Sequence, residues 1–350
     1  MNPSSNPPES ICLLRLSALG DVCHCIALVR ALQQAWPNTR LSWIIGKLEH
    51  RLVEDMAGID FIVFDKRAGW AGVRALRRKL AGRRFDILLH AQVSSRANLL
   101  SLLVRAKRRI GFDRARSREG HGLVINERIA AIPFQHQALA FIEFARYLGV
   151  DSEDVSRAPP IPGEARAFAR QQQPKARHAV LISPASSHAG RNWSVQGYAE
   201  VADWVVKTTN RPVILIGGPS NAEREMGDAI AKAMTQPVRN MIGQDTLKQA
   251  LAMIDRAACL VTPDAGPAHF GAALDTPVVG LYAATWARRS GPLGSLQHSV
   301  DHYQEAAMQF AGRPAEALRW GRRLEYPGVM SLIEPAEVIA RLADILQPES

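Results

Sequence analysis

ICLLRLSALGDV, residues 11–22, and CLVTPDAGPAHFG, residues 259–271, are the two segments that decide the predicted fold. Each is an apolar run that ends in small residues and an Asp, and each leads into a pattern that starts a helix. A strand, a tight turn and a helix N-terminus follow one another in this way at the carboxyl ends of parallel strands, where α/β proteins bind ligands. Two such segments, far apart in the chain, predict two α/β domains that face each other across one cleft.

Strand and helix patterns alternate along both halves, which predicts βαβ units and parallel sheets. The expected strands are 11–16, 41–46, 61–64, 86–90, 109–112, 178–183, 212–217, 258–262 and 278–282. The expected helices are 22–35, 47–56, 73–81, 95–104, 134–148, 195–208, 222–233, 246–255 and 334–346. The domain prediction is a disordered leader over 1–10, an N-terminal domain over 11–160, a linker over 161–177, a C-terminal domain over 178–330, and a final helical segment over 331–350 that packs back on the N-terminal domain.

The composition is that of a globular, cytosolic protein. At about 150 residues per domain, 350 residues with 47% hydrophobic content indicate roughly two domains. No apolar run approaches the ~20 residues of a membrane helix, and residues 1–10 lack the features of a signal peptide. Cys12, Cys23, Cys25 and Cys259 are expected to be reduced and buried, and no second ligand pair makes a metal site of Cys23 and Cys25.

Positive charge is concentrated in the first half of the chain. Sixteen Lys and Arg residues lie between Lys66 and Arg118, and only Asp86 and Asp113 oppose them. A field of one sign attracts anions, whether nucleic acid, anionic lipid or a phosphorylated substrate. The alternative, for residues 74–84, is a solvated basic helix face.

Three loops of the second half are expected to meet at strand ends and to bind a nucleotide. Residues 183–193 offer hydroxyl groups and Arg191 for a diphosphate, residues 217–220 precede a helix whose Glu223 suits a ribose diol, and residues 262–269 offer a helix N-terminus. Taken singly, each is explained by a turn or a helix cap. Neither G-x-x-x-x-G-K-[ST] nor a complete G-x-G-x-x-G occurs, which argues against kinase and dehydrogenase activity.

Asp21 is the candidate general base of the first half. It ends the first strand–helix turn, where it would face the cleft and take a proton from an attacking hydroxyl. The alternative is an N-cap of the helix that follows. His24, one turn further along, is either its partner or a packed side chain.

SALGDV at 17–22, the loop at 186–193, GGP at 217–219 and DAGPAH at 264–269 occur in the order seen in lipopolysaccharide heptosyltransferases. The chain resembles this family, glycosyltransferase family 9, over nearly its whole length. The resemblance implies a GT-B fold with two Rossmann-like domains facing across a cleft, the acceptor on the N-terminal domain and ADP-heptose on the C-terminal domain.

Carried over by position, the resemblance makes Asp21 the catalytic base. Arg191 stands where the family usually has Lys, and Ala265 replaces a usual Thr or Ser. The residues expected at the acceptor are Ser17, His24, Arg114 and Arg118. Those expected at the nucleotide sugar are Ser186, Ser187, Arg191, Gly217, Glu223, Asp264, Ala265, Gly266 and His269.

The resemblance implies inverting transfer of heptose from ADP-L-glycero-D-manno-heptose to Kdo or heptose of the lipopolysaccharide inner core. No cofactor and no metal are expected. The expected partners are ADP-heptose, a lipid A–core acceptor and the anionic surface of the inner membrane, without nucleic acid, for a monomer peripherally bound on the cytoplasmic side. The alternatives are another nucleotide-sugar GT-B enzyme, with a different donor or with epimerase activity, and a non-catalytic sugar-binding module.

Overall fold

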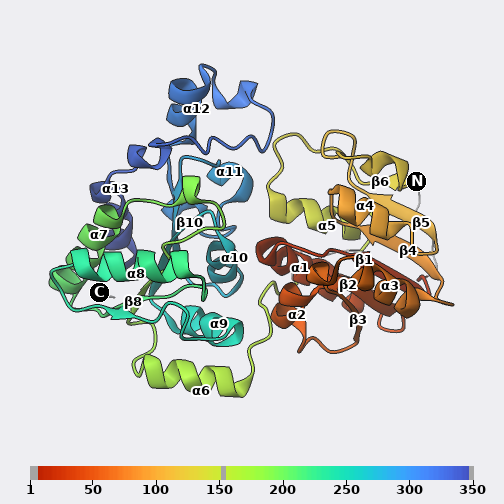
Figure 1. The fold of residues 1–350 in the computed structure, drawn as a ribbon, viewed down its shortest axis with the longest axis horizontal. Coiled ribbons are helices and arrows are strands. Elements are labelled where there is room, and N and C mark those ends of the chain that lie inside the picture. Colours follow the sequence, from red (N-terminus) through yellow and green to blue (C-terminus); the bar gives the residue numbers. More distant parts are fainter. Residues whose placement is uncertain (1–6, 151–154, 347–350) are drawn as a thin grey trace. The chain divides into compact units, whose positions relative to one another are not determined.

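The computed structural model describes residues 7–150 and 155–346 of a chain that divides into two compact units, Met1–Pro160 and Ile161–Ser350 (Figure 1). Each unit is built on one six-stranded parallel sheet with its own helices. No helix in the described ranges is long and apolar enough to cross a membrane.

The first unit has the strand order β3-β2-β1-β4-β5-β6, with every adjacent pair parallel. Its strands are β1 (Ser10–Leu14), β2 (Arg40–Gly46), β3 (Ile59–Phe64), β4 (Phe85–His90), β5 (Ala106–Gly111) and β6 (Glu127–Arg128). Its helices are α1 (Leu19–Ala35), α2 (Lys47–Val53), α3 (Gly69–Leu80), α4 (Ser95–Ser101) and α5 (Gln137–Tyr147), with the 3₁₀ turns η1 (Lys66–Ala68) and η2 (His121–Leu123).

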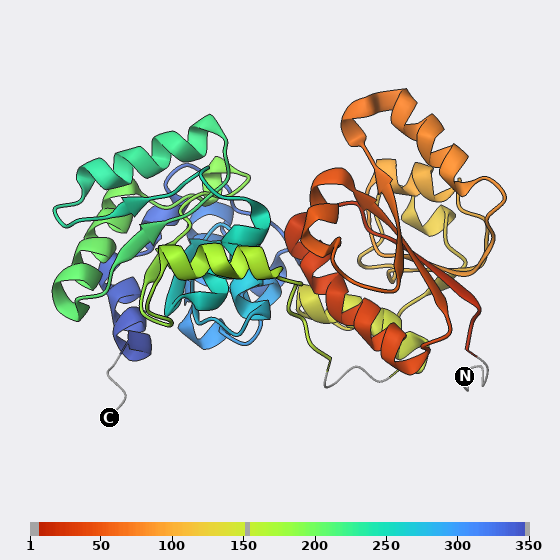
Figure 2. The same cartoon turned by 90° about the horizontal axis from the view of Figure 1, so that it is seen from below.

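The central strands of this sheet are apolar on both faces because helices cover both. α3 and α4 place Leu76, Leu80 and Leu100 in one core with Leu14 and Leu88 of the sheet. α1 packs against α5 on the opposite face (Figure 2). Continuous apolar runs, rather than alternating apolar and polar residues, are typical of parallel strands in a sheet with helices on both faces.

The second unit has the order β12-β11-β10-β7-β8-β9, again entirely parallel. Its strands are β7 (Val180–Ile182), β8 (Val213–Leu215), β9 (Arg239–Asn240), β10 (Cys259–Pro263), β11 (Val278–Tyr282) and β12 (Val300–Asp301). Its helices are α6 (Gly163–Gln172), α7 (Val195–Thr209), α8 (Asn221–Ala233), α9 (Leu247–Arg256), α10 (Gly266–Ala273), α11 (Ala287–Ser290), α12 (Tyr303–Ala311) and α13 (Pro335–Leu346), with the 3₁₀ turns η3 (Ala189–Arg191), η4 (Leu296–His298), η5 (Ala315–Ala317) and η6 (Val329–Leu332).

Two predicted boundaries of this half are corrected by the packing. The expected linker, 161–177, contains α6, which packs against α9 and belongs to the second unit. The final helix was expected on the N-terminal domain, but Val338, Leu342 and Leu346 of α13 lie in the core of the second unit, beside α7. An amphipathic helix packs where an apolar surface is left open, and here that surface is in its own unit.

The other predicted elements are found with ends shifted by a few residues. Ser10, at the end of the expected leader, already belongs to β1, while residues 1–6 lie outside the described ranges. The sequence did not predict α11, α12 or the strands β6, β9 and β12. The four-residue α11 and the two-residue strands are too short to show a period.

Both sheets have the 3-2-1-4-5-6 order of Rossmann folds. In each, the order reverses between two central strands, β1 and β4 in the first unit and β7 and β10 in the second. Loops that leave such a strand pair diverge and leave a crevice, which is where open α/β sheets bind ligands. The segments 11–22 and 259–271 both lead into these two positions.

Candidate active site

Asp21 lies at the reversal point of the first sheet and is held by Arg15. α1 begins two residues before Asp21, and its N-cap is Ala18, so Asp21 is not the helix cap. Arg15 forms an ion pair with Asp21 and donates from Nη1 to the carbonyl of Ala91 at 2.6 Å. Its guanidinium also lies 5.1 Å from the centre of the Phe141 ring. The buried Arg15 therefore orients the Asp21 carboxylate, which keeps a side-chain exposure of 27%.

Ser17 is fixed by the neighbouring strand. Gln92, just beyond β4, accepts from the backbone N–H of Leu16 at 2.6 Å and from that of Ser17 at 3.3 Å. Its Nε2 donates to the Ser17 hydroxyl at 3.3 Å. This side chain ties the loops after β1 and β4 together, so that Ser17 and Asp21 belong to one rigid turn.

Two buried histidines, His90 and His121, pack together near the carboxyl end of β4. His90 ends β4, and its ring lies 4.5 Å from that of His121. His121 accepts from the Phe112 N–H through Nε2 and lies 3.1 Å from Asn98 Oδ1 through Nδ1, which suits a neutral ring. Burial, with the other ring as a further cause, lowers the pKa of His90 to about 3, and burial lowers the pKa of His121 to about 4. Both side chains are neutral packing groups at pH 7.

The other residues expected at the acceptor divide into exposed and buried ones. Arg114 and Arg118 are exposed in the turn that follows β5, at the same carboxyl edge as Asp21. His24 is only 9% exposed and packs its ring against Phe141 at 6.2 Å. The structure brings the two arginines to the edge of the site and places His24 inside the helix packing.

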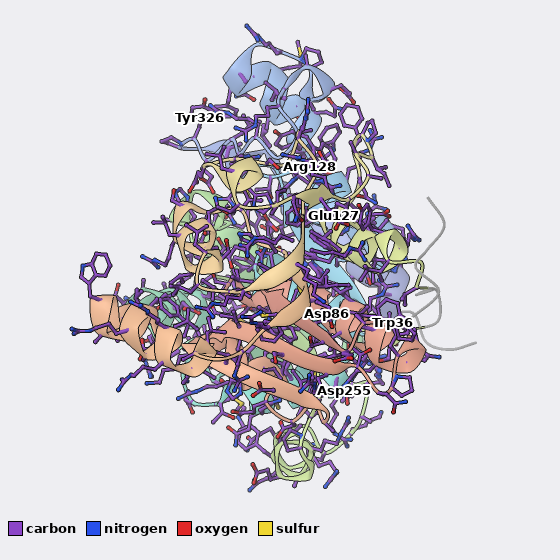
Figure 3. The ribbon with its side chains drawn as sticks, turned by 90° about the vertical axis from the view of Figure 1, so that its right-hand side faces the viewer. Trp36, Asp86, Glu127, Arg128, Asp255 and Tyr326 are labelled. Carbon is purple, nitrogen blue, oxygen red and sulfur yellow. The ribbon has the colours of Figure 1, made fainter. Side chains whose placement is uncertain are left out.

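Some of the sixteen basic residues between Lys66 and Arg118 form hydrogen bonds or ion pairs within the first unit. Arg109 donates to the carbonyls of Ser101, Val104 and Val124, and so closes the loops around β5. Lys107 pairs with Asp86, and Arg108 pairs with Glu127 of β6. Figure 3 labels the two carboxylates, Asp86 and Glu127. In α3, by contrast, three exposed arginines have no carboxylate partner within the described residues: Arg74, Arg77 and Arg78. Part of the excess positive charge therefore faces solvent on α3.

Arg191 is the centre of the second group of predicted residues. It lies in η3, after β7, and is 8% exposed. Its Nε and Nη2 both lie 2.7 Å from Oε1 of Glu325, and Nη1 lies 3.7 Å from Oδ2 of Asp264, which follows β10. The loops after β7 and β10 thus meet at the reversal point of the second sheet, with a cation between two carboxylates.

The loop that carries Arg191 is folded by its own side chains. Ser186 donates from its N–H to Asn192 Oδ1 at 2.7 Å and exchanges hydrogen bonds with the backbone of His188, while Ser187 is exposed. Trp193 is buried, with its indole N–H on the carbonyl of Ile333 at 3.0 Å. Trp193 anchors the loop, and Ser187 and Arg191 remain as ligand groups, whereas the Ser186 hydroxyl already donates to the His188 carbonyl.

Glu223 closes the turn after β8. Its Oε2 accepts from the Gly218 N–H at 2.5 Å, and its Oε1 accepts from the Ser220 hydroxyl at 3.0 Å. A Cβ would come within 3.1 Å of this carboxylate at Gly217 and within 2.8 Å at Gly218, so a larger residue at either position would require Glu223 to shift. Both oxygens of Glu223 already have donors, so the carboxylate has a structural role in the turn in addition to the ribose contact predicted for it.

The start of α10 supplies the third loop. Ala265 is the N-cap and has no side-chain oxygen to cap the helix, which then begins at Gly266. Asp264 precedes the cap, and His269 lies one turn into the helix. The N–H groups and the positive end of the helix dipole at Gly266 suit a negatively charged group. Among the described residues, no cluster of His, Cys, Asp or Glu could hold a metal ion.

Comparisons with known proteins place this geometry in a family. Residues 73–317 match the profile of glycosyltransferase family 9 (heptosyltransferase). The chain is 38% identical over 336 residues to the lipopolysaccharide core heptosyltransferase OpsX of Haemophilus influenzae, and 96% of each protein is covered. The chain belongs to glycosyltransferase family 9. It is a glycosyltransferase, as the sequence motifs predicted.

Solved structures share the fold of this family member. The glycosyl transferase family 9 protein of Veillonella parvula has a TM-score of 0.77 at 20% identity, with 99% of this chain and 98% of the other covered. Escherichia coli heptosyltransferase WaaC with ADP has a TM-score of 0.70 at 19% identity, with 96% and 99% covered. These matches confirm the predicted fold class, two Rossmann-like α/β halves with neighbours of GT-B type.

Three residues of the site were missed by the sequence analysis. Arg15 could have been found, because it is a single charge inside an otherwise apolar strand and must have a partner when buried. Gln92 and Glu325 carry no such signal. Glu325 lies more than a hundred residues from Arg191 in sequence and in no recognisable motif.

Proposed function

We propose that this chain transfers heptose from ADP-L-glycero-D-manno-heptose to the inner core of lipopolysaccharide, with inversion at the anomeric carbon. The observation that carries the proposal is the meeting of Arg191 and Asp264 at the reversal point of the second sheet. It occurs in a chain that resembles a lipopolysaccharide core heptosyltransferase over 96% of both lengths. The order of the motifs along the chain supports the same conclusion.

On the donor side, Arg191 binds the diphosphate. Its remaining N–H groups, those not taken by Glu325, and the start of α10 supply the positive potential for the ADP leaving group. The Ser187 hydroxyl and the ring of His269 contribute further donors, and the Ser186 hydroxyl, which donates to the His188 carbonyl, holds the loop in place beside them. Charge that develops on the leaving phosphate is thus neutralised by groups of the chain itself, and the proposal requires no metal.

On the acceptor side, Asp21 acts as the general base. Its carboxylate accepts the proton of the attacking acceptor hydroxyl while Arg15 holds its orientation. The C–O bond to ADP breaks as the bond to the acceptor oxygen forms, in one displacement through an oxocarbenium-like state. Ser17, Arg114 and Arg118 bind the acceptor sugars, either Kdo or heptose.

We further propose that the enzyme works as a monomer on the cytoplasmic surface of the inner membrane. The three exposed arginines of α3 attract anionic lipid, and Trp70 of the same helix, 83% exposed, suits the headgroup region. A lipid A–core acceptor, which carries phosphates and carboxylates, is drawn to the same positive surface.

Transfer assays test this function directly. The purified chain is incubated with ADP-L-glycero-D-manno-heptose and acceptors truncated after Kdo, after the first heptose or after the second. We expect one acceptor to gain a single heptose, with α or β stereochemistry opposite to that of the donor. No transfer to any of the three acceptors, from fully folded protein, contradicts the proposal.

Thermal shift separates the alternatives. A ligand that binds the folded state better than the unfolded state raises the melting temperature. Because the proposed donor is ADP-heptose, we expect ADP to raise the melting temperature more than UDP does. Stabilisation by UDP but not by ADP indicates another donor or an epimerase. Stabilisation by free sugars alone indicates a sugar-binding module.

A further inference from the structure

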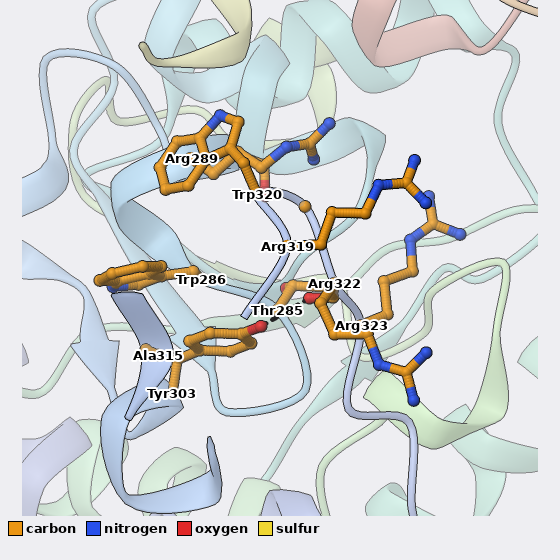
Figure 4. Close-up of a pocket in the computed structure, with 11 residues that line it drawn as sticks. Thr285, Trp286, Arg289, Tyr303, Ala315, Arg319, Trp320, Arg322 and Arg323 are labelled. Carbon is orange, nitrogen blue, oxygen red and sulfur yellow. Dashed lines mark hydrogen bonds between the residues drawn. The ribbon is translucent and has the colours of Figure 1, made fainter. Parts of the chain in front are cut away.

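A pocket rich in arginine and aromatic side chains lies in the second unit, outside the predicted donor residues. It is lined by side chains of α11, of α12 and of residues 319–323. The rings of Trp286 and Tyr303 stack 5.3 Å apart on one side, and Trp320 meets Trp286 edge-on at 5.5 Å. In Figure 4 the guanidinium groups of the lining arginines lie on the opposite side of the pocket from these rings. These arginines are Arg289, Arg319, Arg322 and Arg323.

Three of the lining arginines have no ion pair with a carboxylate among the described residues. Within residues 7–150 and 155–346, no carboxylate pairs with Arg319, Arg322 or Arg323. Arg322 has only a 3.4 Å contact to the Tyr326 hydroxyl. The nearest acid in sequence, Glu325, is paired with Arg191. Three arginines within five residues, without a carboxylate partner, form a positive surface that attracts anions.

The backbone beneath these arginines is fixed. The Leu324 N–H donates to Ala284 beyond β11 at 2.7 Å, and the Tyr303 hydroxyl donates to the Arg322 carbonyl at 2.7 Å. Gly321 has φ +82°, and a Cβ there would lie 2.7 Å from Nε of Arg289. The segment therefore passes close over Arg289 in a conformation that favours glycine. The arginines project from a preformed support.

The pocket lies next to the donor site on the same edge of the sheet. The donor residues follow β7, β8 and β10, whereas the pocket follows β11 and β12, the next strands in the sheet order. Residues 319–325 connect the two, since Glu325 at one end holds Arg191 and the arginines at the other end line the pocket. A group bound here would therefore lie on the same edge of the sheet as the proposed donor.

We propose that this pocket binds a phosphate or carboxylate group carried by a sugar of the acceptor. Guanidinium groups bind both anions through paired N–H donors, and a Trp face packs against the C–H groups of a sugar ring. The inference rests on the proposed transferase function, because it assigns the anion to the acceptor. The interior has room for about one water molecule, 10 Å³, so the anion binds at the mouth, where the arginines are exposed.

Binding of small probes tests the pocket without any transfer reaction. Glucose 6-phosphate and glucuronate supply the two anions, and glucose is the neutral control, with titrations followed by the fluorescence of Trp286 and Trp320. The variant Arg319→Gln/Arg323→Gln removes two charges from side chains that form no hydrogen bond or ion pair with any other described residue. Arg313→Gln, on an exposed arginine outside the pocket, is the matched control.

We expect at least one anionic probe to bind the wild-type chain and the Arg313→Gln control. We expect its affinity to fall at least about tenfold in the double variant, with the affinity for ADP unchanged within twofold. Equal binding of the probes to the double variant and the wild type overturns the proposal. A tenfold loss of ADP affinity does so too, because the pocket would then belong to the donor site.

Kinetics with the lipopolysaccharide acceptor complete the test. The double variant should raise the acceptor KM about tenfold and leave the donor KM unchanged. A wild-type chain that transfers heptose but binds neither anionic probe overturns the pocket and leaves the proposed function in place. A chain that binds a probe through these arginines and transfers no heptose contradicts the proposed function and, with it, the assignment of the anion to the acceptor.

Discussion

The substitution Arg191→Ala removes a cation that the proposed donor and two carboxylates share. In the free chain, Arg191 has two nitrogens at 2.7 Å from Glu325 and one at 3.7 Å from Asp264. Loss of charge-assisted hydrogen bonds to the diphosphate should weaken ADP binding by about 1.5–3 kcal/mol, or roughly 10- to 150-fold in Kd. The same change leaves the side chains of Glu325 and Asp264, 18% and 12% exposed, without their cation. We expect the free energy of unfolding of this unit to fall by about 1–3 kcal/mol.

A second substitution separates the two effects. The double variant Arg191→Ala/Glu325→Gln removes the carboxylate that Arg191→Ala leaves without its cation. Part of the lost free energy of unfolding should therefore return, while ADP binding stays weak. Arg191→Lys keeps the charge but lacks the paired N–H groups, so it should recover ADP binding more fully than stability. Calorimetry with ADP and urea unfolding measure both quantities. An ADP affinity of Arg191→Ala within twofold of wild type refutes the placement at the diphosphate, and equal stability of single and double variants refutes the role of the ion pair.

Asp21→Asn should lower kcat by roughly 10²–10⁴ with the ADP affinity unchanged, and a variant that keeps half of the wild-type kcat contradicts a base at this position. Replacing the three exposed arginines of α3 by Gln should raise the acceptor KM and weaken binding to anionic vesicles by up to about 1 kcal/mol per charge, with the donor KM unchanged; normal vesicle binding would leave α3 a merely solvated face. His90 and His121 have lowered pKa values, so the unfolded chain binds their protons first as the pH falls. Their contribution to stability is complete above pH 6.5 and is lost as the pH falls toward 4, so urea unfolding should show a loss of roughly 4 kcal/mol between pH 7 and pH 5, about 2 kcal/mol for each histidine, and a flat profile contradicts the neutral pair.

The sequence was sufficient for the sheets and for the loops that follow their central strands. Buried parallel strands are continuous apolar runs, and the turns after them must carry small and polar residues, so segments such as 11–22 reveal strand, turn and helix together. For the same reason Asp21 and Arg191 could be placed at strand ends before any coordinates were known. The strand order of each sheet then places the loops that carry these two residues at the reversal points, after β1 and after β7.

Contacts between distant segments could not be predicted in this way. A count of charges does not distinguish Arg109, which closes loops through backbone carbonyls, from an arginine of α3 that faces solvent. Nor does it reveal that Glu325 holds Arg191, because side chain pairing depends on where an irregular segment returns to the sheet. The prediction for α13 failed for a related reason: an amphipathic pattern shows that a helix packs, and not on which surface.

The position of α13 has a consequence for the synthesis of the chain. The first unit has all its strands and helices once residue 160 has been made, so it is able to fold while the ribosome continues. The core of the second unit contains Val338 and Leu342, so its sheet stays uncovered beside α7 until residues 335–346 emerge. Ribosomes that stall before this point would hold a finished N-terminal unit attached to an aggregation-prone partial one, which is the kind of nascent chain that chaperones bind.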